Sequence, residues 1–347
     1  MLAAKLKVNK GLIVNATEHL GSKLLMSGGG RCNITHDGSI KDFVDCYGES
    51  GRKLRKCLYK HSNIELVDWL QSCGISTVSQ DGRVFPQSMK ARDILDMLIN
   101  LANNNGWEFK LNTRVIDIAE YRSMTDALVI ATGGITYPQT GSDGSMFKAL
   151  EKCGIAIVEP KSALAPIHVK NYPYSEISGV SVSDVTVTAF SSDITSTCKG
   201  KAARMTGDLL FTHNGFSGPV ILNISRYAEP GETIRICYNK EYESLPKSFQ
   251  KILAHRSIGQ SGDIKTSKLA ALLESDEFIV DYIDSNGMVT RGGISLDEID
   301  FTTMQLKKLP GIYAIGEALD VDGITGGYNL QMCYSTACAV ADTLNNK

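Results

Sequence analysis

The chain has 347 residues, enough for two or three domains, and 43% of them are hydrophobic, which is typical of a globular protein. Its 36 lysines and arginines nearly balance 38 aspartates and glutamates, and the resulting net charge of -2 argues against a nucleic-acid partner. No apolar run is long enough to span a membrane. The nine cysteines contain no C-x-x-C pair, which favours reduced thiols in a cytoplasmic protein.

The first 160 residues alternate between strand and helix patterns. Short apolar or alternating runs predict strands at 12–14, 107–120 and 126–134. Apolar residues spaced by three and four predict helices at 52–76 and 88–106, and 144–158 has the pattern of a helix followed by a strand. This alternation is typical of a doubly wound α/β domain.

The pattern changes near residue 161. ISGVSVSDVTVTAFSS and TGDLLFTHNGFSGPVILNIS alternate with a period of two between Gly, Asn and Pro turns, which predicts an antiparallel barrel inserted into a split α/β domain. The expected parts are the first α/β part at 1–160, the barrel at 161–240, a small helical insert at 241–275, the last barrel strand at 276–288 and the C-terminal α/β part at 289–347.

Three glycine-rich segments, 27–33, 131–134 and 316–327, lie at the expected ends of strands. In an open α/β sheet this edge binds ligands, because backbone N–H groups there can meet phosphate or carbonyl oxygens. None of the three segments matches the G-x-x-x-x-G-K-[ST] phosphate loop, so phosphoryl transfer is not expected. Three such segments in one chain predict a shared ligand site.

Two further features leave the chemistry of the site open. Asp320 and Asp322 lie close together, but no histidine or third acid accompanies them at ligand spacing, so no metal site is predicted. His213, in FTHNGFSGP, is a candidate general acid on a barrel hairpin. The alternative is a loop histidine held by hydrogen bonds of the turn, and both interpretations remain.

Six motifs carry a resemblance that runs in order along nearly the whole chain: LGSKLLMSGGGRCNIT, GRVFPQSMKA, ALVIATGGITYPQTGSDG, GDLLFTHNGFSGPVILNIS, VTRGGISLDEID and GIYAIGEALDVDGITGGYNLQ. The chain resembles the BaiN/YhiN-type NAD(P)/FAD-dependent oxidoreductases. This resemblance implies an α/β fold with a two-dinucleotide-binding, Rossmann-like FAD domain, split by an antiparallel β-barrel and a small helical subdomain.

The resemblance also implies which residues contact FAD. The loop against the flavin comprises Gly28, Gly29, Gly30, Arg31, Cys32 and Asn33. Val115 would pass the adenine, and Ala131, Thr132 and Gly133 the pyrophosphate. Gly316, Glu317 and Asp320 would hold ribityl and phosphate, and Gly327, Asn329 and Leu330 would face the isoalloxazine. NAD(P)H is a candidate electron donor.

The chain departs from the family pattern at its beginning. Relatives start with a buried strand and a G-x-G-x-x-G loop, whereas MLAAKLKVNKG matches only the end of the helix that follows. Asn15 stands where an acidic residue usually binds the adenosine ribose. These departures favour an N-terminally incomplete FAD domain over a functional short form. They predict weak FAD binding, and inactivity through truncation is one interpretation.

The expected function is a cytoplasmic FAD-dependent oxidoreductase that transfers hydride between flavin and an unidentified small organic substrate. One branch of the family is associated with reduction of unsaturated steroid rings. The first alternative is a flavin-free remnant or binding protein without redox activity. The second is a flavin-dependent RNA-modifying enzyme, which the near-neutral charge disfavours. No nucleic acid and no membrane are expected as partners, and the sequence does not predict the oligomeric state.

Overall fold

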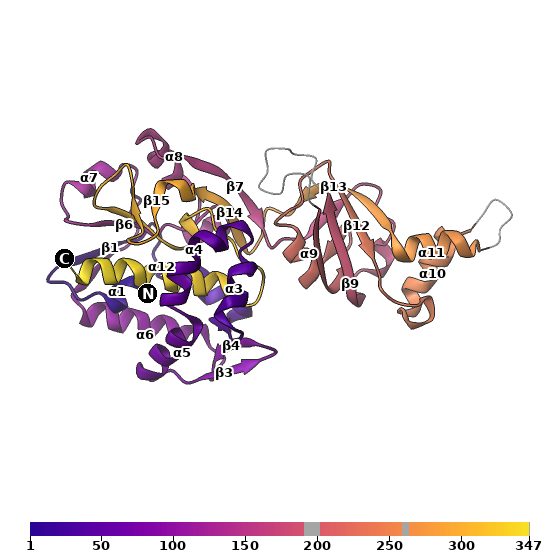
Figure 1. Cartoon of the computed structure of the whole chain (residues 1–347), viewed down its shortest axis with the longest axis horizontal. Helices are drawn as coiled ribbons and strands as arrows, with labels where there is room; N and C mark the ends of the chain where they lie inside the picture. The colour runs from indigo at the N-terminus through magenta and orange to yellow at the C-terminus, as the bar shows by residue number, and fades with distance from the viewer. Residues whose placement is uncertain (191–201, 259–263, 347) are drawn as a thin grey trace. The chain divides into compact units, whose positions relative to one another are not determined.

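A computed structural model describes residues 1–190, 202–258 and 264–346. The chain divides into two compact units, which differ in architecture and are described separately (Figure 1). The first unit, termed the α/β unit, comprises Met1–Lys161 and Val289–Lys347. The second, termed the barrel unit, comprises Ser162–Met288. Residues 259–263 of the expected helical insert lie outside the described ranges, as does Cys198.

The strands of the α/β unit form several small sheets. β1 (Gly11–Val14) pairs in parallel with β5 (Trp107–Lys110), and β6 (Leu128–Ile130) pairs in parallel with β17 (Ile312–Ala314). The second sheet continues antiparallel through β16 (Gln305–Leu306) and β15 (Ile299–Asp300). A further sheet has the order β2 (Thr35–His36), β4 (Arg83–Pro86) and β3 (Thr77–Gln80), and β14 (Val289–Ile294) pairs with β7 (Ile157–Ala163). The parallel pairs agree with the predicted Rossmann-like architecture.

Helices surround these sheets, and the last of them forms part of the core (Figure 1). They are α1 (Leu2–Lys5), α2 (Ser22–Met26), α3 (Ile40–Cys46), α4 (Glu49–Lys60), α5 (Asn63–Ser72), α6 (Ala91–Asn104), α7 (Ile118–Arg122), α8 (Ser145–Lys152) and α12 (Tyr328–Asn345). α12 packs against α1, α4 and α5, and its Tyr334 and Val340 are fully buried. Most residues between Tyr328 and Ala341 are buried, as expected of a helix that lies within a core.

The barrel unit contains a closed antiparallel six-stranded barrel, which confirms the predicted insert. The strand order is β10 (Ala203–Phe211), β11 (Gly215–Ser217), β8 (Ile167–Val169), β13 (Asp276–Ile283), β12 (Thr233–Cys237) and β9 (Ser181–Phe190). Tyr174, Phe211, Phe216 and Phe249 pack edge to face or tilted in its core. Closure of the barrel leaves its strands without free edges.

Two short helices, α10 (Lys247–Arg256) and α11 (Thr266–Glu274), form the helical insert. A buried ion pair joins the first of them to the barrel. Arg256 donates two hydrogen bonds to Asp276, at 2.8 and 2.9 Å, and the Asp276 side chain is only 1% exposed. The hydroxyl of Tyr238 donates to the same carboxylate at 3.0 Å. The carboxylate is therefore fully satisfied inside the unit.

Two local predictions were wrong. The expected strand at 107–120 ends at Lys110, because Asn112 adopts a left-handed backbone with φ 48°, and α7 begins after the N-cap Asp117. The apolar run after the FTHNGFSG turn was expected to be strand but forms the helix α9 (Pro219–Ile224). Proline at the first helical position after Gly218 starts this helix, and the period of a short, mostly apolar run does not distinguish helix from strand.

Candidate functional site

The triple glycine of the first glycine-rich segment forms an exposed turn after α2. Gly28 and Gly29 have left-handed backbone angles, with φ 58° and 66°, and Gly30 has φ 85°. A Cβ atom at Gly29 would meet no atom within 4 Å. The Arg31 Nε donates to the Gly28 carbonyl at 3.1 Å and thereby closes the turn. The turn therefore exposes backbone that a ligand can approach closely.

Cys32 has a structural environment. Its side chain is 1% exposed and packs in a hydrophobic cluster with Ile34 and Tyr334, against which Leu330 also packs. Burial raises the pKa of the Cys32 thiol to about 11, although a hydrogen bond with Ser27 opposes the shift. A neutral buried thiol is a poor nucleophile, so Cys32 has a packing role in this cluster.

Asn33 connects the first glycine-rich segment to the start of α12. With its amide oriented to match both neighbours, Asn33 donates to the Thr35 carbonyl at 3.0 Å and accepts from the Gly327 amide at 3.1 Å. Gly327 has φ 98°, and a Cβ atom there would lie 2.4 Å from the Thr35 carbonyl oxygen. Only glycine permits this close approach. The contact brings together two of the predicted cofactor segments that lie almost 300 residues apart.

The third segment is also held by side chains of α12. The Asn329 amide accepts from the Gly323 amide at 2.8 Å and donates to the Gly323 carbonyl at 3.0 Å. The Gly316 amide donates to the Thr336 hydroxyl at 3.1 Å. Leu330 is half-buried. Asn329 is thus committed to the backbone of its own loop, which it positions.

The second glycine-rich segment follows β6, with Ala131 and Thr132 exposed. Gly133 has φ 71°, and Gly134 packs so closely on Thr290 that a Cβ atom would lie 2.1 Å from the threonine oxygen. The same oxygen accepts a hydrogen bond from the Ile135 amide at 2.8 Å. The segment is therefore fixed against β14 while its first residues remain accessible.

One ion pair connects the second and third segments to the helix before the first. Lys23 in α2 lies 2.7 Å from both carboxylate oxygens of Glu317 and donates to the Thr136 hydroxyl at 2.8 Å. The Thr290 amide donates to Glu317 at 2.8 Å. The Lys23 and Glu317 side chains are 25% and 16% exposed. Glu317 therefore links the third segment to α2 and to the residues that follow the second segment.

Asp320 and Val115 are placed less centrally. Burial, together with the nearby Asp322 carboxylate, raises the pKa of Asp320 to about 6, although a hydrogen bond from the Gly292 backbone opposes the shift. A protonated Asp320 can donate a hydrogen bond, which an ionised one cannot. Val115 is half-buried and packs against the core cluster that contains Ile130.

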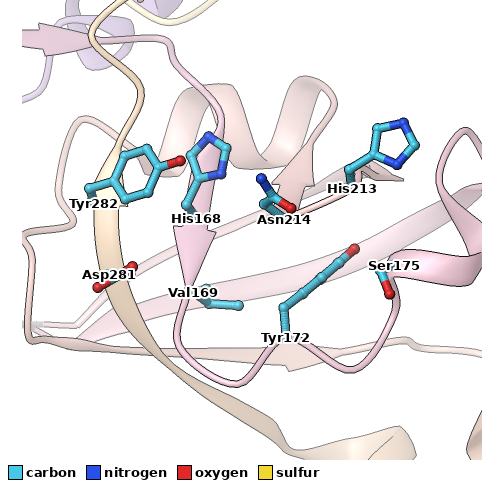
Figure 2. A pocket seen from close by; sticks show the side chains of 8 residues that line it. All are labelled: His168, Val169, Tyr172, Ser175, His213, Asn214, Asp281 and Tyr282. Carbon is cyan, nitrogen blue, oxygen red and sulfur yellow. The ribbon is translucent and has the colours of Figure 1, made fainter.

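His213 belongs to the barrel unit, whereas the other predicted site residues belong to the α/β unit. It is exposed, lies in the turn between β10 and β11, and lines a pocket together with His168, Tyr172, Asn214 and Tyr282 (Figure 2). Both the general-acid and the turn interpretation of His213 remain untested. Sequence reasoning missed His168 and Tyr282, because neither lies in a motif.

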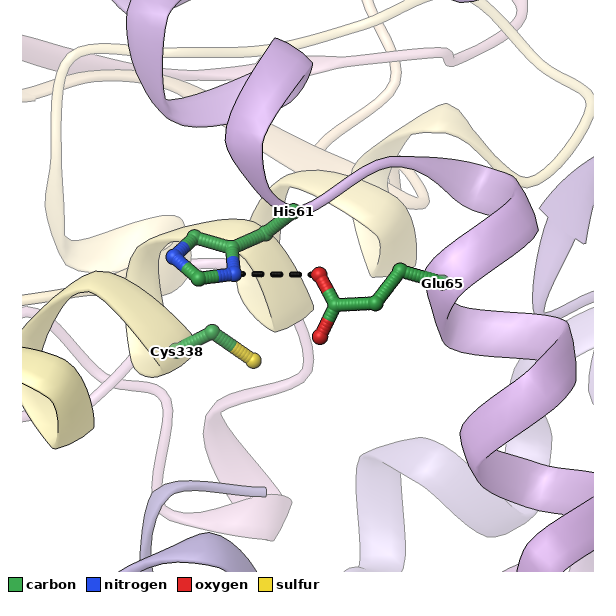
Figure 3. Close-up of side chains that lie close together, drawn as sticks. All are labelled: His61, Glu65 and Cys338. Atoms are coloured by element: carbon green, nitrogen blue, oxygen red, sulfur yellow. Dashed lines mark hydrogen bonds and ion pairs between the residues drawn. The ribbon is translucent and has the colours of Figure 1, made fainter.

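A second unpredicted cluster lies in the α/β unit, where ligand atoms of His61, Glu65 and Cys338 are within 4.8 Å of one another (Figure 3). Its only sequence signal is the i,i+4 spacing of His61 and Glu65, which bond at 3.0 Å. Lys5 already donates to Glu65 at 3.0 Å, and a resident ammonium disfavours a metal cation. Burial alone would raise the pKa of Glu65, but hydrogen bonds from His61, Lys5 and Tyr334 outweigh it and lower the pKa to about 2.

The chain is similar to curated proteins of two kinds. The ribosomal RNA dihydrouridine synthase of Escherichia coli is 29% identical over 389 residues, covering 96% of this chain and 91% of the relative. Its namesake from Haemophilus influenzae is 27% identical, covering 94% and 90%. A 3-dehydro-bile acid delta(4,6)-reductase of Clostridium scindens is 26% identical, covering 93% and 90%.

A variant of the E. coli quinol fumarate reductase FrdA is a similar solved structure, with a TM-score of 0.48 and 12% identity. That match covers 96% of this chain and 65% of the other.

The expectation that nucleic acid is not a partner is not supported, because two similar proteins are named as enzymes of ribosomal RNA. That expectation relied on net charge, which averages over a whole surface and does not exclude a local RNA-binding site. Among the described residues, no helix is long and apolar enough to cross a membrane.

The family resemblance of the quoted motifs is confirmed. Residues 1–343 match the HI0933-like protein Rossmann domain, which accounts for almost the entire chain. The match also confirms the predicted Rossmann-like fold around the inserted barrel. The chain belongs to the HI0933-like family of flavin-dependent oxidoreductases.

Proposed function

We propose that the protein is an FAD-dependent reductase of a ring carbon–carbon double bond conjugated to a carbonyl group, and that its substrate is a uridine of RNA. Conversion of uridine to dihydrouridine reduces such a bond, and so does a bile acid delta(4,6)-reductase, so the names of the relatives share this chemistry. The RNA substrate is favoured because two relatives carry that name.

The observation that carries the proposal is the convergence of the three glycine-rich segments. Asn33 contacts Gly327, and Lys23 contacts Glu317 and Thr136. Exposed backbone of Gly28 to Gly30, Ala131 and Thr132 therefore belongs to one connected assembly. The donor set fits a large polar cofactor, because left-handed glycines offer N–H groups that no Cβ atom covers and the residues at a strand end add further backbone amides.

Within this proposal, Gly28, Gly29, Gly30 and Gly327 bind the flavin side, and Ala131, Thr132, Gly133 and Gly316 bind the pyrophosphate and ribityl side. Arg31, Asn33, Glu317 and Asn329 position these backbones through the contacts described above. Asp320 is the proposed hydrogen-bond partner of the ribityl chain. Val115 is proposed to lie beside the adenine. Bound FAD would supply the hydride, with NAD(P)H as the proposed electron donor.

The cofactor site is tested with two matched glycine variants. Gly29→Ala and Gly154→Ala each place a Cβ atom at a left-handed glycine, with φ 66° and 77°, where no atom lies within 4 Å. Both should cost about 1–2 kcal/mol of stability for the same backbone reason. If FAD binds against the triple glycine, Gly29→Ala weakens FAD binding at least about tenfold in a fluorescence titration, and Gly154→Ala does not. Equal dissociation constants for the two variants would count against the site.

The substrate is tested with FAD-loaded protein, NAD(P)H, and either a uridine-containing ribosomal RNA transcript or a 3-oxo-Δ4 steroid. The proposal expects the RNA to gain the mass of two hydrogens. Reduction of the steroid alone would overturn the RNA assignment and leave the reductase assignment. Reduction of neither substrate by FAD-loaded protein would support the alternative of a binding protein without redox activity.

A further inference from the structure

The α/β unit carries a strongly cationic surface on the outer side of α4 (Figure 1). One side of this helix is buried in the core, through Gly51, Leu54, Cys57 and Leu58. At 3.6 residues per turn, the basic side chains of the helix share the opposite side, and all of them are exposed. This surface, termed the basic face, consists of Arg52, Lys53, Arg55, Lys56 and Lys60. The only acidic residue of α4 is Glu49, in its first turn.

Acidic residues of the protein neutralise part of the basic face. Lys53 pairs with Asp297 at 2.6 Å, and Lys60 pairs with Asp342 at 2.5 Å. The other three cations of the face have no carboxylate within ion-pair distance among the described residues: Arg52, Arg55 and Lys56. The chain as a whole has a net charge of -2, so this local excess of positive charge is not visible in the composition.

The three unpaired cations are close neighbours on the helix. Arg52 precedes Arg55 by three residues and Lys56 by four, and side chains at these spacings lie next to each other. Like charges at these spacings destabilise a helix. An anionic ligand with several charges would remove this repulsion.

Arg55 is also ordered by a neighbouring ring. Its guanidinium lies over Tyr59, 5.4 Å from the ring centroid, and the tyrosine is 40% exposed. A cation–π contact of this kind orients a guanidinium without using its N–H donors. These donors are therefore available to a phosphate group, whose oxygens match the guanidinium fork.

The start of α4 is attached to the third glycine-rich segment. The Ser50 hydroxyl donates to the Asp320 carbonyl at 3.3 Å. Just before the helix, the Cys46 carbonyl accepts from the Ile324 amide at 3.1 Å. The basic face thus begins beside residues of the proposed cofactor site. From Arg52 to Lys60 it extends about 12 Å along the helix axis.

We propose that the basic face of α4 binds the phosphodiester backbone of the RNA substrate next to the uridine that is reduced. The inference rests on the proposed RNA substrate and names the surface that holds it. Successive phosphates of one strand can meet several cations, whereas the single carboxylate of a bile acid cannot. An anionic membrane is a poorer partner, because Leu54 and Leu58 face the core and cannot insert into lipid.

The test measures binding of a fluorescein-labelled single-stranded RNA to the full chain by anisotropy over a series of salt concentrations. The triple variant Arg52→Gln/Arg55→Gln/Lys56→Gln should bind about tenfold or more weakly at low salt. Its slope of log Kd against log salt should decrease by about 2, because each lost phosphate contact removes about 0.7. A charge-retaining variant, Arg52→Lys/Arg55→Lys/Lys56→Arg, should keep most of the affinity.

The matched control is Lys7→Gln/Lys148→Gln/Lys152→Gln, which removes the same net charge from exposed lysines of the same unit. It should keep the wild-type slope. Equal slopes for the wild type and the Arg52/Arg55/Lys56 triple variant would overturn the inference, and so would the absence of RNA binding by the wild-type chain. Unchanged RNA binding with lost binding to phosphatidylserine vesicles would assign the face to a membrane and would also overturn it.

Dihydrouridine formation distinguishes this inference from the proposed function. The Arg52/Arg55/Lys56 triple variant should raise the KM for RNA and leave kcat and FAD binding unchanged, since the face does not touch the reacting base. If the wild type forms dihydrouridine and the triple variant has the same KM, the inference fails and the proposed function stands. If the wild type binds RNA through the face but reduces no uridine, the proposed function fails and the inference stands.

Discussion

The Lys23–Glu317 ion pair should determine how firmly the three glycine-rich segments are held. Lys23→Met removes the ammonium and leaves Glu317 with the Thr290 amide at 2.8 Å and the Thr136 hydroxyl at 3.3 Å. Glu317→Gln removes the negative charge of the pair. The double variant completes a cycle whose coupling energy isolates the pair from the other effects of each substitution.

The magnitude follows from the burial of the two side chains. Exposed ion pairs contribute about 0–1 kcal/mol, and breaking a fully buried pair costs about 3–5 kcal/mol. Lys23 and Glu317 are 25% and 16% exposed, so we expect a coupling energy of about 2 kcal/mol. For a unit of this size, a loss of about 2 kcal/mol corresponds to a decrease in Tm of about 4–8 °C.

Scanning calorimetry is the suitable assay, since it can resolve the unfolding of the two units. The matched control is the Lys53–Asp297 pair, which has a similar separation of 2.6 Å but side chains 46% and 87% exposed. The cycle of Lys53→Met with Asp297→Asn should give a smaller coupling energy, because water solvates both side chains. A Lys23–Glu317 coupling energy below about 0.5 kcal/mol, or no larger than that of the control, would refute the assignment of Glu317 as the residue that joins the segments.

Three further predictions concern stability. Asp276→Asn leaves the Arg256 charge without its buried partner and should cost about 3–5 kcal/mol in a denaturant titration, and a cost below about 1 kcal/mol would contradict the buried network. The pKa of Glu65 is depressed to about 2, so the ionised Glu65 stabilises the fold above pH 4.5, and this stabilisation is lost as the pH falls toward 2. Glu65→Gln should abolish the decrease in Tm that this protonation causes. The pKa of Asp320 is raised to about 6, so ionisation of Asp320 destabilises the fold as the pH rises from about 4 through 6. The free energy of unfolding of Asp320→Asn should therefore exceed that of the wild type by about 2 kcal/mol at pH 7.5, with no such difference at pH 4.

Much of the architecture could be predicted from local patterns. The period-two segments after residue 161 predicted a barrel, and the βα alternation on either side predicted the domain into which it is inserted. Both predictions rest on side-chain periodicity, which a short stretch of sequence shows independently of the rest of the chain. Where periodicity was absent, as in Pro219–Ile224, the prediction was wrong.

The sequence by itself also determined the candidate cofactor segments, because a run such as Gly28 to Gly30 has a backbone requirement that is visible locally. Only the tertiary structure showed which of these residues have partners within the protein. The Glu317 carboxylate contacts Lys23, which lies 294 residues away. No local pattern encodes such a pair, since it joins α2 to the turn that follows β17.

The barrel pocket is the clearest case of a feature that the sequence concealed. His168, Asn214 and Tyr282 lie in three separate segments, and of the pocket residues only His213 and Asn214 belong to a quoted motif. They meet because β8 lies between β11 and β13 in the closed barrel, which pairs His168 with Gly215 on one side and Tyr282 on the other. Strand order and register arise from the packing of the whole barrel, so the sequence predicted that a barrel exists while the fold alone determined which side chains share a pocket.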